Sequence, residues 1–215
     1  MATMPAQGPA PVAVRPLDPS RAADFLAFFD HEHGPAFADN PEWSTCYCQF
    51  YHTPKAVDWK ARGGDENRAA MAGRIAAGEM EGFLAYAGDA DSTEREVVGW
   101  LNAQPRNKLP HCFARMRLAP TEIDVPDFKA AQIVCFVIHP QWRRRGVARA
   151  LLAAACDSLA RRGIEQVEAY PFKSGDSEDA GDHYHGTLSM FLAAGFGIVG
   201  EDSNMTVVRK TLTGT

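Results

Sequence analysis

Apolar and polar positions follow two different periods along this chain, and the period changes at turn-forming residues. Apolar residues that recur every three or four positions predict helices, and short apolar runs bounded by glycine, proline or polar residues predict strands. Helices are expected at residues 18–30, 65–77, 147–162 and 187–194, and strands at 12–15, 82–87, 96–103, 131–138, 165–170, 196–199 and 205–212. This order predicts one mixed α/β domain over residues 12–213, preceded by a flexible tail at 1–11.

The most apolar run of the chain, Ala131 to Ile138, is continuous rather than alternating. Burial on both faces produces such a run, so it predicts a central strand covered on both sides. His139-Pro140 closes this strand. The helix that follows from Val147 carries its apolar residues on one face until Gly163 ends it, so a strand–turn–helix unit is expected here.

Four arginines surround the start of that helix, at Arg143, Arg144, Arg145 and Arg149, with Gly146 between them. The first amides of a helix have no intrahelical partners and lie at the positive end of its dipole, so a helix start can bind an anion. Gly146 lets the backbone approach such an anion closely. The segment differs from a Walker A loop, which needs Gly-Lys-Ser/Thr. A diphosphate site and a solvated basic helix start both fit the cluster taken alone.

Residues 31–62 break the regular pattern with prolines but carry many aromatic residues. A polar linker would not concentrate tryptophan, tyrosine and phenylalanine in this way. We therefore expect an ordered segment that packs on the core and lines a pocket. Trp43 and Tyr47 in this segment are candidate substrate-binding residues.

A polar stretch at 104–130 follows the strand that ends near Asn102. Loops of this length are uncommon in compact domains unless they serve a function, so contact with a substrate is expected here. Asn102 and Arg106 are candidate substrate-binding residues, and Arg106 would suit a carboxylate.

The composition limits the choice of function. Hydrophobic residues make up 46% of the chain, charged residues 23%, and the net charge is −5, which is typical of a soluble globular protein without overall attraction to nucleic acid or anionic membranes. No run approaches the ~20 apolar residues of a membrane span, and no basic segment precedes an apolar one near the start, so a cytoplasmic location is expected. The five cysteines are expected to be reduced thiols.

Cys46-Tyr47-Cys48, with His52 nearby, suggests one half of a zinc site. Structural zinc needs four ligands, and paired cysteines are normally separated by two or more residues. Only one half-site is visible, so these cysteines are better explained as residues of a strand or turn, and no metal is expected.

Two blocks of residues in the second half of the chain form recognisable motifs. The first is Phe136-Val137-Ile138-His139-Pro140, followed by Arg143-x-x-Gly146-x-Ala148 and Leu151-Leu152, and the second is Phe191-x-x-x-Gly195-Phe196. The first resembles the acetyl-CoA signature of the GNAT superfamily of acyl-CoA-dependent N-acetyltransferases, and the second is similar to that family's second block, in which a short helix leads into Gly-Phe. The resemblance covers residues 131–212 well and the first half only through the order of its elements.

The resemblance implies a mixed, mostly antiparallel, twisted sheet flanked by helices, with a V-shaped splay between the strands near 131–138 and 165–170. Pantetheine would enter the splay and pair with the Phe136 and Ile138 main chain, and the Ile138 amide would polarise the thioester carbonyl. The implied residues for binding CoA are Phe136, Val137, Ile138, Arg143, Arg144, Arg145, Gly146, Val147, Ala148, Arg149 and Phe191.

The resemblance further implies direct attack by an amine on acetyl-CoA, without a covalent enzyme intermediate. Phe191 stands where the family often has a tyrosine acid, so the acid is sought among Tyr184, His185 and Ser189. Glu168 is the candidate base, together with histidines that titrate near neutrality. Tyr170, at the end of the splayed strand, is a candidate for substrate binding.

These features predict transfer of an acetyl or other short acyl group from acetyl-CoA to an amine on a small molecule or peptide, with a homodimer allowed. Two rival hypotheses stay open. One is a CoA-binding sensor or interaction module without catalysis, which the replacement at Phe191 supports. The other is a metal-dependent protein built around Cys46, Cys48 and His52.

Overall fold

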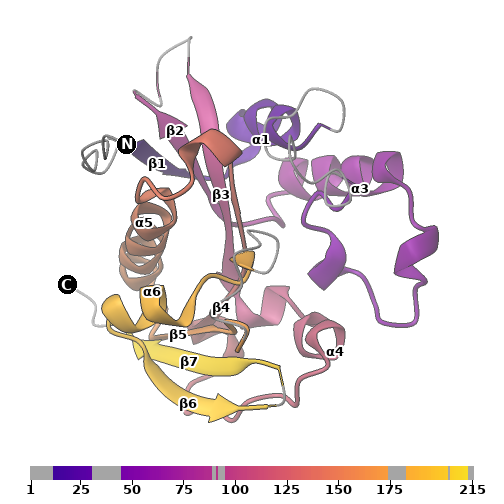
Figure 1. Ribbon diagram of the computed structural model, residues 1–215. Helices are drawn as coiled ribbons and strands as arrows, with labels where there is room; N and C mark the ends of the chain where they lie inside the picture. Colours follow the sequence, from indigo (N-terminus) through magenta and orange to yellow (C-terminus); the bar gives the residue numbers. More distant parts are fainter. Residues whose placement is uncertain are drawn as a thin grey trace, which may run out of the picture.

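The computed structural model describes residues 12–30, 45–88, 91, 95–173, 183–202 and 204–212. Within them, seven strands form one sheet in the order β1-β2-β3-β4-β5-β7-β6 (Figure 1). Only the β4–β5 pair is parallel, and the other neighbours are antiparallel. The strands are β1 (Val12–Pro16), β2 (Phe83–Ala87), β3 (Glu96–Pro105), β4 (Ala130–Ile138), β5 (Gln166–Ala169), β6 (Gly197–Glu201) and β7 (Thr206–Thr211).

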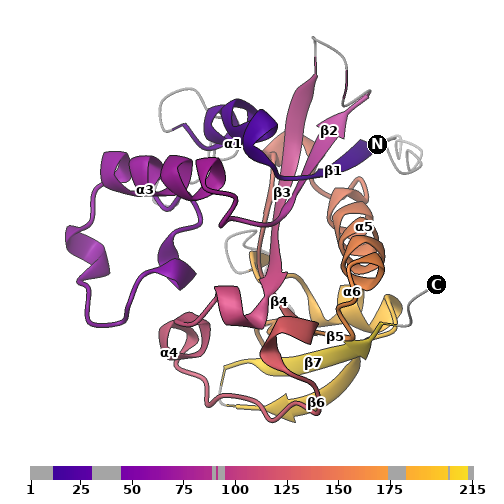
Figure 2. The same ribbon diagram turned by 180° about the vertical axis from the view of Figure 1, so that it is seen from behind.

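Helices cover both faces of this sheet, as Figures 1 and 2 show from opposite sides. α5 and α6 lie on one face, and α1 and α3 lie on the other. The bounds are α1 (Ala22–Phe29), α3 (Gly64–Ala76), α4 (Cys112–Met116), α5 (Val147–Arg161) and α6 (Leu188–Ala193). The predicted mixed sheet, mostly antiparallel and flanked by helices, is confirmed.

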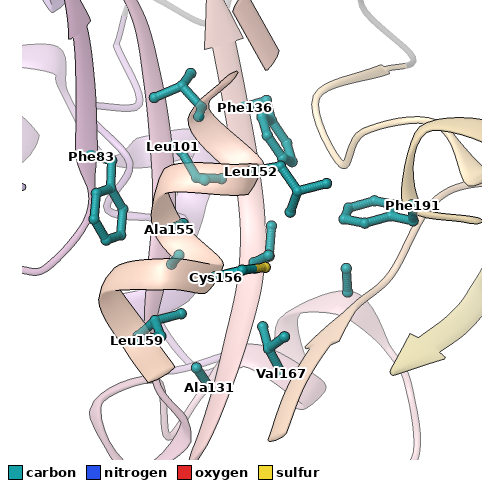
Figure 3. Packing of buried hydrophobic residues seen from close by; sticks show 14 of the residues in the cluster. Phe83, Leu101, Ala131, Phe136, Leu152, Ala155, Cys156, Leu159, Val167 and Phe191 are labelled. Atoms are coloured by element: carbon teal, nitrogen blue, oxygen red, sulfur yellow. The ribbon is translucent and has the colours of Figure 1, made fainter. Parts of the chain in front are cut away.

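The core on the α5 face is purely apolar. Leu152, Ala155 and Leu159 of α5 pack against Phe83 and Leu101 of the sheet (Figure 3). α5 lies close against β3 at Gly99, where an added Cβ would lie 2.9 Å from Val147 Cγ1. The missing side chain at this position lets the start of α5 lie directly on the sheet.

The core on the opposite face is built on aromatic residues. Phe25 of α1 meets the Trp100 ring edge-on, with centroids 4.9 Å apart, and stacks on Phe29 at 4.5 Å. Met71 and Ile75 of α3 are buried in the same cluster. β3 is therefore covered on both sides, because its residues face a different core at alternate positions.

β4 pairs with β5 only along its first half. The parallel register runs from Ala130↔Gln166 to Ile133↔Ala169, whereas the antiparallel pairing with β3 continues to Ile138↔Gly99. β5 also pairs with β7 on its other side, and beyond Ala169 the chain continues along that side through a bridge from Phe172 to Met205, just before β7. The two strands therefore separate after Ile133, and the predicted splay is confirmed.

A β-bulge lies where the splay begins. The β3 register passes from Ala103↔Ile133 to Asn102↔Cys135, which leaves Val134 as the extra residue of β4. As a result, Phe136 and Ile138 face α5, while Cys135 and Val137 face the aromatic side of the sheet. The bulge thus decides which side chains of β4 reach each face.

The prediction of one long polar loop at 104–130 is wrong. β3 extends to Pro105, and the stretch contains α4 and two short 3-10 turns. Leu109 and Cys112 are buried there against Tyr170 and Val134, which anchors the segment to the sheet. A helix of five residues is too short to display a period that the sequence could reveal.

The predicted tail at 1–11 and the candidate Trp43 lie outside the described residues. Among the residues that the structure does describe, no helix is long and apolar enough to cross a membrane.

Candidate functional site

The open half of β4 directs main-chain amides into the splay. The His139 amide donates to the Val98 carbonyl at 3.0 Å, so it points toward β3. Amides alternate in direction along a strand, and those of Phe136 and Ile138 therefore point the other way, into the opening. The Phe136 amide donates there to the Tyr184 carbonyl at 2.6 Å. The Ile138 amide is the next donor along the same edge.

The start of α5 lies one short turn after β4. Gly146 caps the helix with φ of 85°, and Arg144 has φ of 62°. The Gly146 carbonyl accepts the first helical bond, from the Ala150 amide at 3.0 Å. Helix geometry therefore leaves the amides of Val147, Ala148 and Arg149 without intrahelical acceptors, so this end can bind an anion.

The arginines around this helix start differ in their surroundings. Arg143 is half-buried, and its Nε donates to the Ile138 carbonyl at 3.2 Å, which ties the turn to the open end of β4. Arg144, Arg145 and Arg149 are exposed. The Arg145 guanidinium lies 5.5 Å from the centroid of the Trp142 ring. Positive charge is therefore concentrated where the free helix amides lie.

A cavity of about 230 Å³ lies against the other side of the same half-strand. Cys135 and Val137 form its β4 wall, and Tyr184 belongs to it as well, so the cavity adjoins the opening at Phe136. Its lining is aromatic and thiol-bearing: Phe29, Thr45, Cys46, Cys48, Phe50, Tyr51, Trp59, Cys135, Val137 and Tyr184. An opening with free amides, a basic helix start and a small cavity thus surround one half of β4.

The sequence profile of the Acetyltransferase (GNAT) family matches residues 41–177, which is more than half of the chain. The chain belongs to the GNAT acetyltransferase family. Among proteins of curated function, none matches its sequence.

Solved structures of the GNAT family have the same fold. The GNAT domain of PAT from Streptomyces lividans is similar with a TM-score of 0.54 and 14% identity, over 94% of this chain and 90% of that one. A GCN5-related N-acetyltransferase from Kribbella flavida has a TM-score of 0.50 and 17% identity, over 94% of this chain and 98% of that one. The PaiA N-acetyltransferase from Thermoplasma acidophilum, solved with coenzyme A, has a TM-score of 0.50 and 11% identity, over 94% of this chain and 99% of that one.

Glu168 and Arg106, predicted as base and substrate ligand, lie in the closed half of the sheet. The Glu168 carboxylate is fully buried and accepts from Arg209 Nη2 at 2.7 Å, Thr121 Oγ1 at 2.7 Å and Tyr170 Oη at 3.0 Å. Arg106 donates to the Thr121 carbonyl and pairs with Asp127 at 3.3 Å. These contacts bond both charged groups to other protein groups in the closed half and do not support the roles of base and substrate ligand.

Tyr170 belongs to the same network rather than to a substrate site. Its hydroxyl donates to Glu168 and accepts from Gln132 Nε2 at 2.7 Å, and its side chain is fully buried. Burial raises the pKa of Tyr170 well above its usual value, and the Glu168 charge adds to this. A neutral hydroxyl that is already bonded on both sides has a structural role.

Asn102 and Tyr47 are buried as well. Asn102 Nδ2 donates to Cys48 Sγ at 3.3 Å, while its Oδ1 accepts from Gln104 at 2.8 Å. Tyr47 donates to Asp30 at 3.1 Å and does not belong to the cavity wall. Direct contact with a substrate is therefore not supported for either. The expectation of a pocket lined by aromatic residues of 31–62 is confirmed through Phe50, Tyr51 and Trp59.

Of the candidate acids, only Tyr184 reaches the cavity. Ser189 is exposed on α6, with its Oγ 3.3 Å from Thr187 Oγ1. His185 is fully buried, and its Nε2 lies 2.7 Å from Tyr51 Oη. Burial lowers the pKa of His185 to about 3, so the expectation that it titrates near neutrality is wrong.

Phe191, predicted to contact CoA, is a core residue. Its side chain is fully buried, with ring centroids 6.2 Å from Phe136 and 5.1 Å from Phe196. Figure 3 shows it directed into the same cluster as Leu152. The side chains of Phe136 and Val147 are buried as well, so those two residues can offer only their main chain to a ligand.

The zinc hypothesis has no support in the described part of the chain, where no three His, Cys, Asp or Glu side chains come together as ligands. His52 Nε2 lies 3.2 Å from Gln104 Nε2 instead. Burial lowers the pKa of His52 to about 3, aided by nearby Arg74. Cys135 could not be predicted as a wall residue of the cavity, because a continuous apolar strand does not show which way each side chain points.

Proposed function

We propose that this GNAT acetyltransferase transfers an acetyl or other short acyl group from acetyl-CoA to a primary amine, by direct attack within a ternary complex. The observation that carries the proposal is the open half of β4, with a basic helix start at its end and a cavity against its side. Acetyl transfer itself follows from the family. The amine acceptor and the direct mechanism are the proposed parts.

The α5 end would hold the diphosphate of CoA. The amides of Val147, Ala148 and Arg149 and the exposed arginines supply donors and positive charge at one place. The structure of the Thermoplasma relative with coenzyme A is consistent with CoA as the donor molecule.

The acyl group would lie at the Ile138 amide. A fixed amide directed at a developing oxyanion stabilises the transition state of acyl transfer. The Phe136 amide, also predicted to pair with pantetheine, already donates to Tyr184. Pantetheine would therefore pair at Ile138, and the segment around Tyr184 would form one side of its path.

The cavity would hold the acceptor. The ten wall residues that the structure describes include five aromatic side chains, and none of these ten is Asp, Glu, Lys or Arg. Such a wall favours an amine with an apolar or aromatic body. It also favours the uncharged form of the amine, because an ammonium group taken out of water without a partner is costly. The acceptor amine would then lose its proton as it enters the cavity, and a dedicated base such as Glu168 would not be needed.

Tyr184 is the proposed acid. It lies in the cavity wall and, through its own carbonyl, beside the opening where the thioester would be. A phenol at this position could protonate the departing CoA thiolate, the role that the family often gives to a tyrosine at the position of Phe191.

The test combines binding and turnover. Acetyl-CoA should raise the melting temperature of the protein, and free CoA should then be released with one or more members of a panel of arylalkylamines, aliphatic amines, polyamines, amino acids and peptides. The proposal expects the arylalkylamines to give the highest kcat/KM. Release that is equal with all amines, or absent with all of them, would contradict the acceptor part.

The second candidate is a CoA-binding module without catalysis. The burial of Phe191 at the position of the family tyrosine favours it, because no hydroxyl is present there. It predicts the same rise in melting temperature with acetyl-CoA but no amine-dependent release of CoA. The cytoplasmic location and the homodimer stay predictions from the sequence.

A further inference from the structure

Three cysteines from two parts of the chain line the cavity. Cys46 and Cys48 come from a turn at 45–48, and Cys135 comes from β4. The turn is strained, since Tyr47 has φ of 43° and Cys48 has φ of 57°, a region that non-glycine residues rarely adopt. The strain is held by burial, because Tyr47 and Cys48 are each only 3% exposed.

The strained turn places the Cys48 sulfur under several donors. Trp100 Nε1 and Asn102 Nδ2 each lie 3.3 Å from Cys48 Sγ, and both side chains are fully buried. An indole N–H and an amide NH₂ can only donate, so the sulfur acts as acceptor toward both. Cys135 stands directly opposite Asn102 in the β3–β4 register, which brings its thiol close to the same sulfur. Donors directed at one sulfur stabilise its anionic form.

The proton of the thiol pair belongs on Cys135. The hydrogen bond from Cys135 lowers the pKa of Cys48, and the bonds from Trp100 and Asn102 add to this against the opposing effect of burial. The same bond raises the pKa of Cys135 well above its usual value, together with burial. Burial raises the pKa of Cys46 to about 12. The pair therefore consists of one thiolate-prone sulfur and one protonated partner.

The other described residues that line the cavity with this pair carry no fixed charge. Among the described wall residues, Tyr51 and Tyr184 are the remaining titratable groups, and none is acidic or basic. Burial raises the pKa of Tyr51 well above its usual value, so its hydroxyl stays neutral. Cys48 is thus the group in this wall that is best placed to act as an anion or a nucleophile.

We propose that Cys48 is an oxidation site that reacts with hydrogen peroxide and closes onto Cys135 as a disulfide across the cavity. In the first step, the Cys48 sulfur attacks one peroxide oxygen, the O–O bond breaks, and hydroxide leaves to become water on gaining a proton. The product is a sulfenic acid at Cys48. In the second step, the Cys135 sulfur attacks that of Cys48, the S–O bond breaks, and the second water leaves with the Cys135 proton. Two thiols are oxidised as one peroxide is reduced to two waters.

The disulfide would change the cavity, because both sulfurs belong to its wall. It would join the 45–48 turn to β4 beside Val137, where we place the acceptor. The expected loss of activity on oxidation rests on the proposed function. The formation of the disulfide does not, so the two can fail separately.

The first experiment ranks the five thiols of the native, reduced wild-type protein by their rate of alkylation with iodoacetamide, read by peptide mass spectrometry. Cys48 should react at least about tenfold faster than Cys112 and Cys156, since burial raises the pKa of both of those thiols. Equal rates, or Cys156 as the fastest, would overturn the proposal. No variant is needed, so failure of a variant to fold cannot obscure the result.

The second experiment treats the protein with hydrogen peroxide and maps the linkage without reduction. The wild type should give a Cys48–Cys135 disulfide that dithiothreitol reverses. Cys135→Ser should stop at a Cys48 sulfenic acid that dimedone traps, and Cys156→Ser, on the α5 face, should behave as wild type. A Cys46–Cys48 linkage, or stepwise oxidation at Cys112 and Cys156 alone, would overturn the proposal.

A parallel measurement separates this proposal from the proposed function. Acetyl-CoA should raise the melting temperature of the oxidised protein as it does that of the reduced one, because the helix start lies away from the disulfide, while release of CoA with the acceptor should fall at least about tenfold. An oxidised protein that carries the disulfide yet keeps its full rate would contradict the placing of the acceptor and leave the disulfide itself established.

Discussion

The two halves of β4 differ in the way their polar neighbours are used. In the closed half, Ala130 to Ile133, β4 pairs with strands on both sides, and the charged groups beside it, Glu168 and Arg106, bond to one another and to the chain. In the open half, Cys135 to Ile138, β4 has separated from β5, and the Ile138 amide, the α5 start and the thiol-lined cavity lie around it. Titratable residues close to a cleft therefore need not line it, because those beside the paired half of the strand bond to other protein groups instead.

Replacement of Glu168 is the strongest test of the closed half. Glu168→Gln removes the counter-charge of the largely buried Arg209 and leaves Arg106 with Asp127 alone, so we expect the free energy of unfolding to fall by about 3 kcal/mol, measured by urea denaturation. The rate per folded molecule should be unchanged. Glu165→Gln, which breaks a half-exposed pair with Lys129, is the matched control and should cost under about 1 kcal/mol. A hundredfold loss of kcat in a stable Glu168→Gln protein would instead make Glu168 the base.

Replacement of Tyr184 tests the open half. Tyr184→Phe should lower kcat about 100-fold with the acceptor found in the panel, because the proposed acid is lost while the ring remains. Ser189→Ala, an exposed position on α6, should change kcat less than about twofold. If Tyr184→Phe keeps the wild-type kcat, the leaving thiolate needs no acid from this residue.

The open half could be predicted because its features are local motifs in the sequence. The closed half could not, because its contacts join residues that are far apart in the sequence. The start of α5 was found because strand, turn, Gly146 and helix are neighbours in the sequence. The partners of Glu168 are 47 residues away at Thr121 and 41 away at Arg209, and no local pattern records such pairings. The cavity was missed in part for another reason: the bulge at Val134 changes which residues of β4 face it, and a continuous apolar run conceals that shift.

Replacement of the two glycines at the ends of α5 distinguishes an effect on ligand binding from an effect on backbone strain. Gly146 has φ of 85° and Gly163 has φ of 81°, so alanine at either position should cost a similar ~1 kcal/mol of stability. Only Gly146→Ala should weaken binding of CoA, by about tenfold, since its Cβ enters the place of the anion. Isothermal titration of both variants measures this. Equal affinities would place the diphosphate elsewhere.

His185 is fully buried against Tyr51 and should appear in the pH dependence of stability rather than of catalysis. Its pKa falls from about 6.5 in the unfolded chain to about 3 in the fold because of burial. Below pH 6.5 the unfolded chain therefore gains a proton that the folded protein does not, and stability falls as the pH decreases toward 3, by about 1.4 kcal/mol for each pH unit.

His185→Gln can keep a hydrogen bond to Tyr51 and should remove this part of the slope in urea denaturation at a series of pH values. His52→Gln should remove a similar part, because burial also lowers the pKa of His52 to about 3. An unchanged slope in the His185→Gln protein would mean that His185 carries a proton in the fold, and it would then return as a candidate acid beside Tyr184.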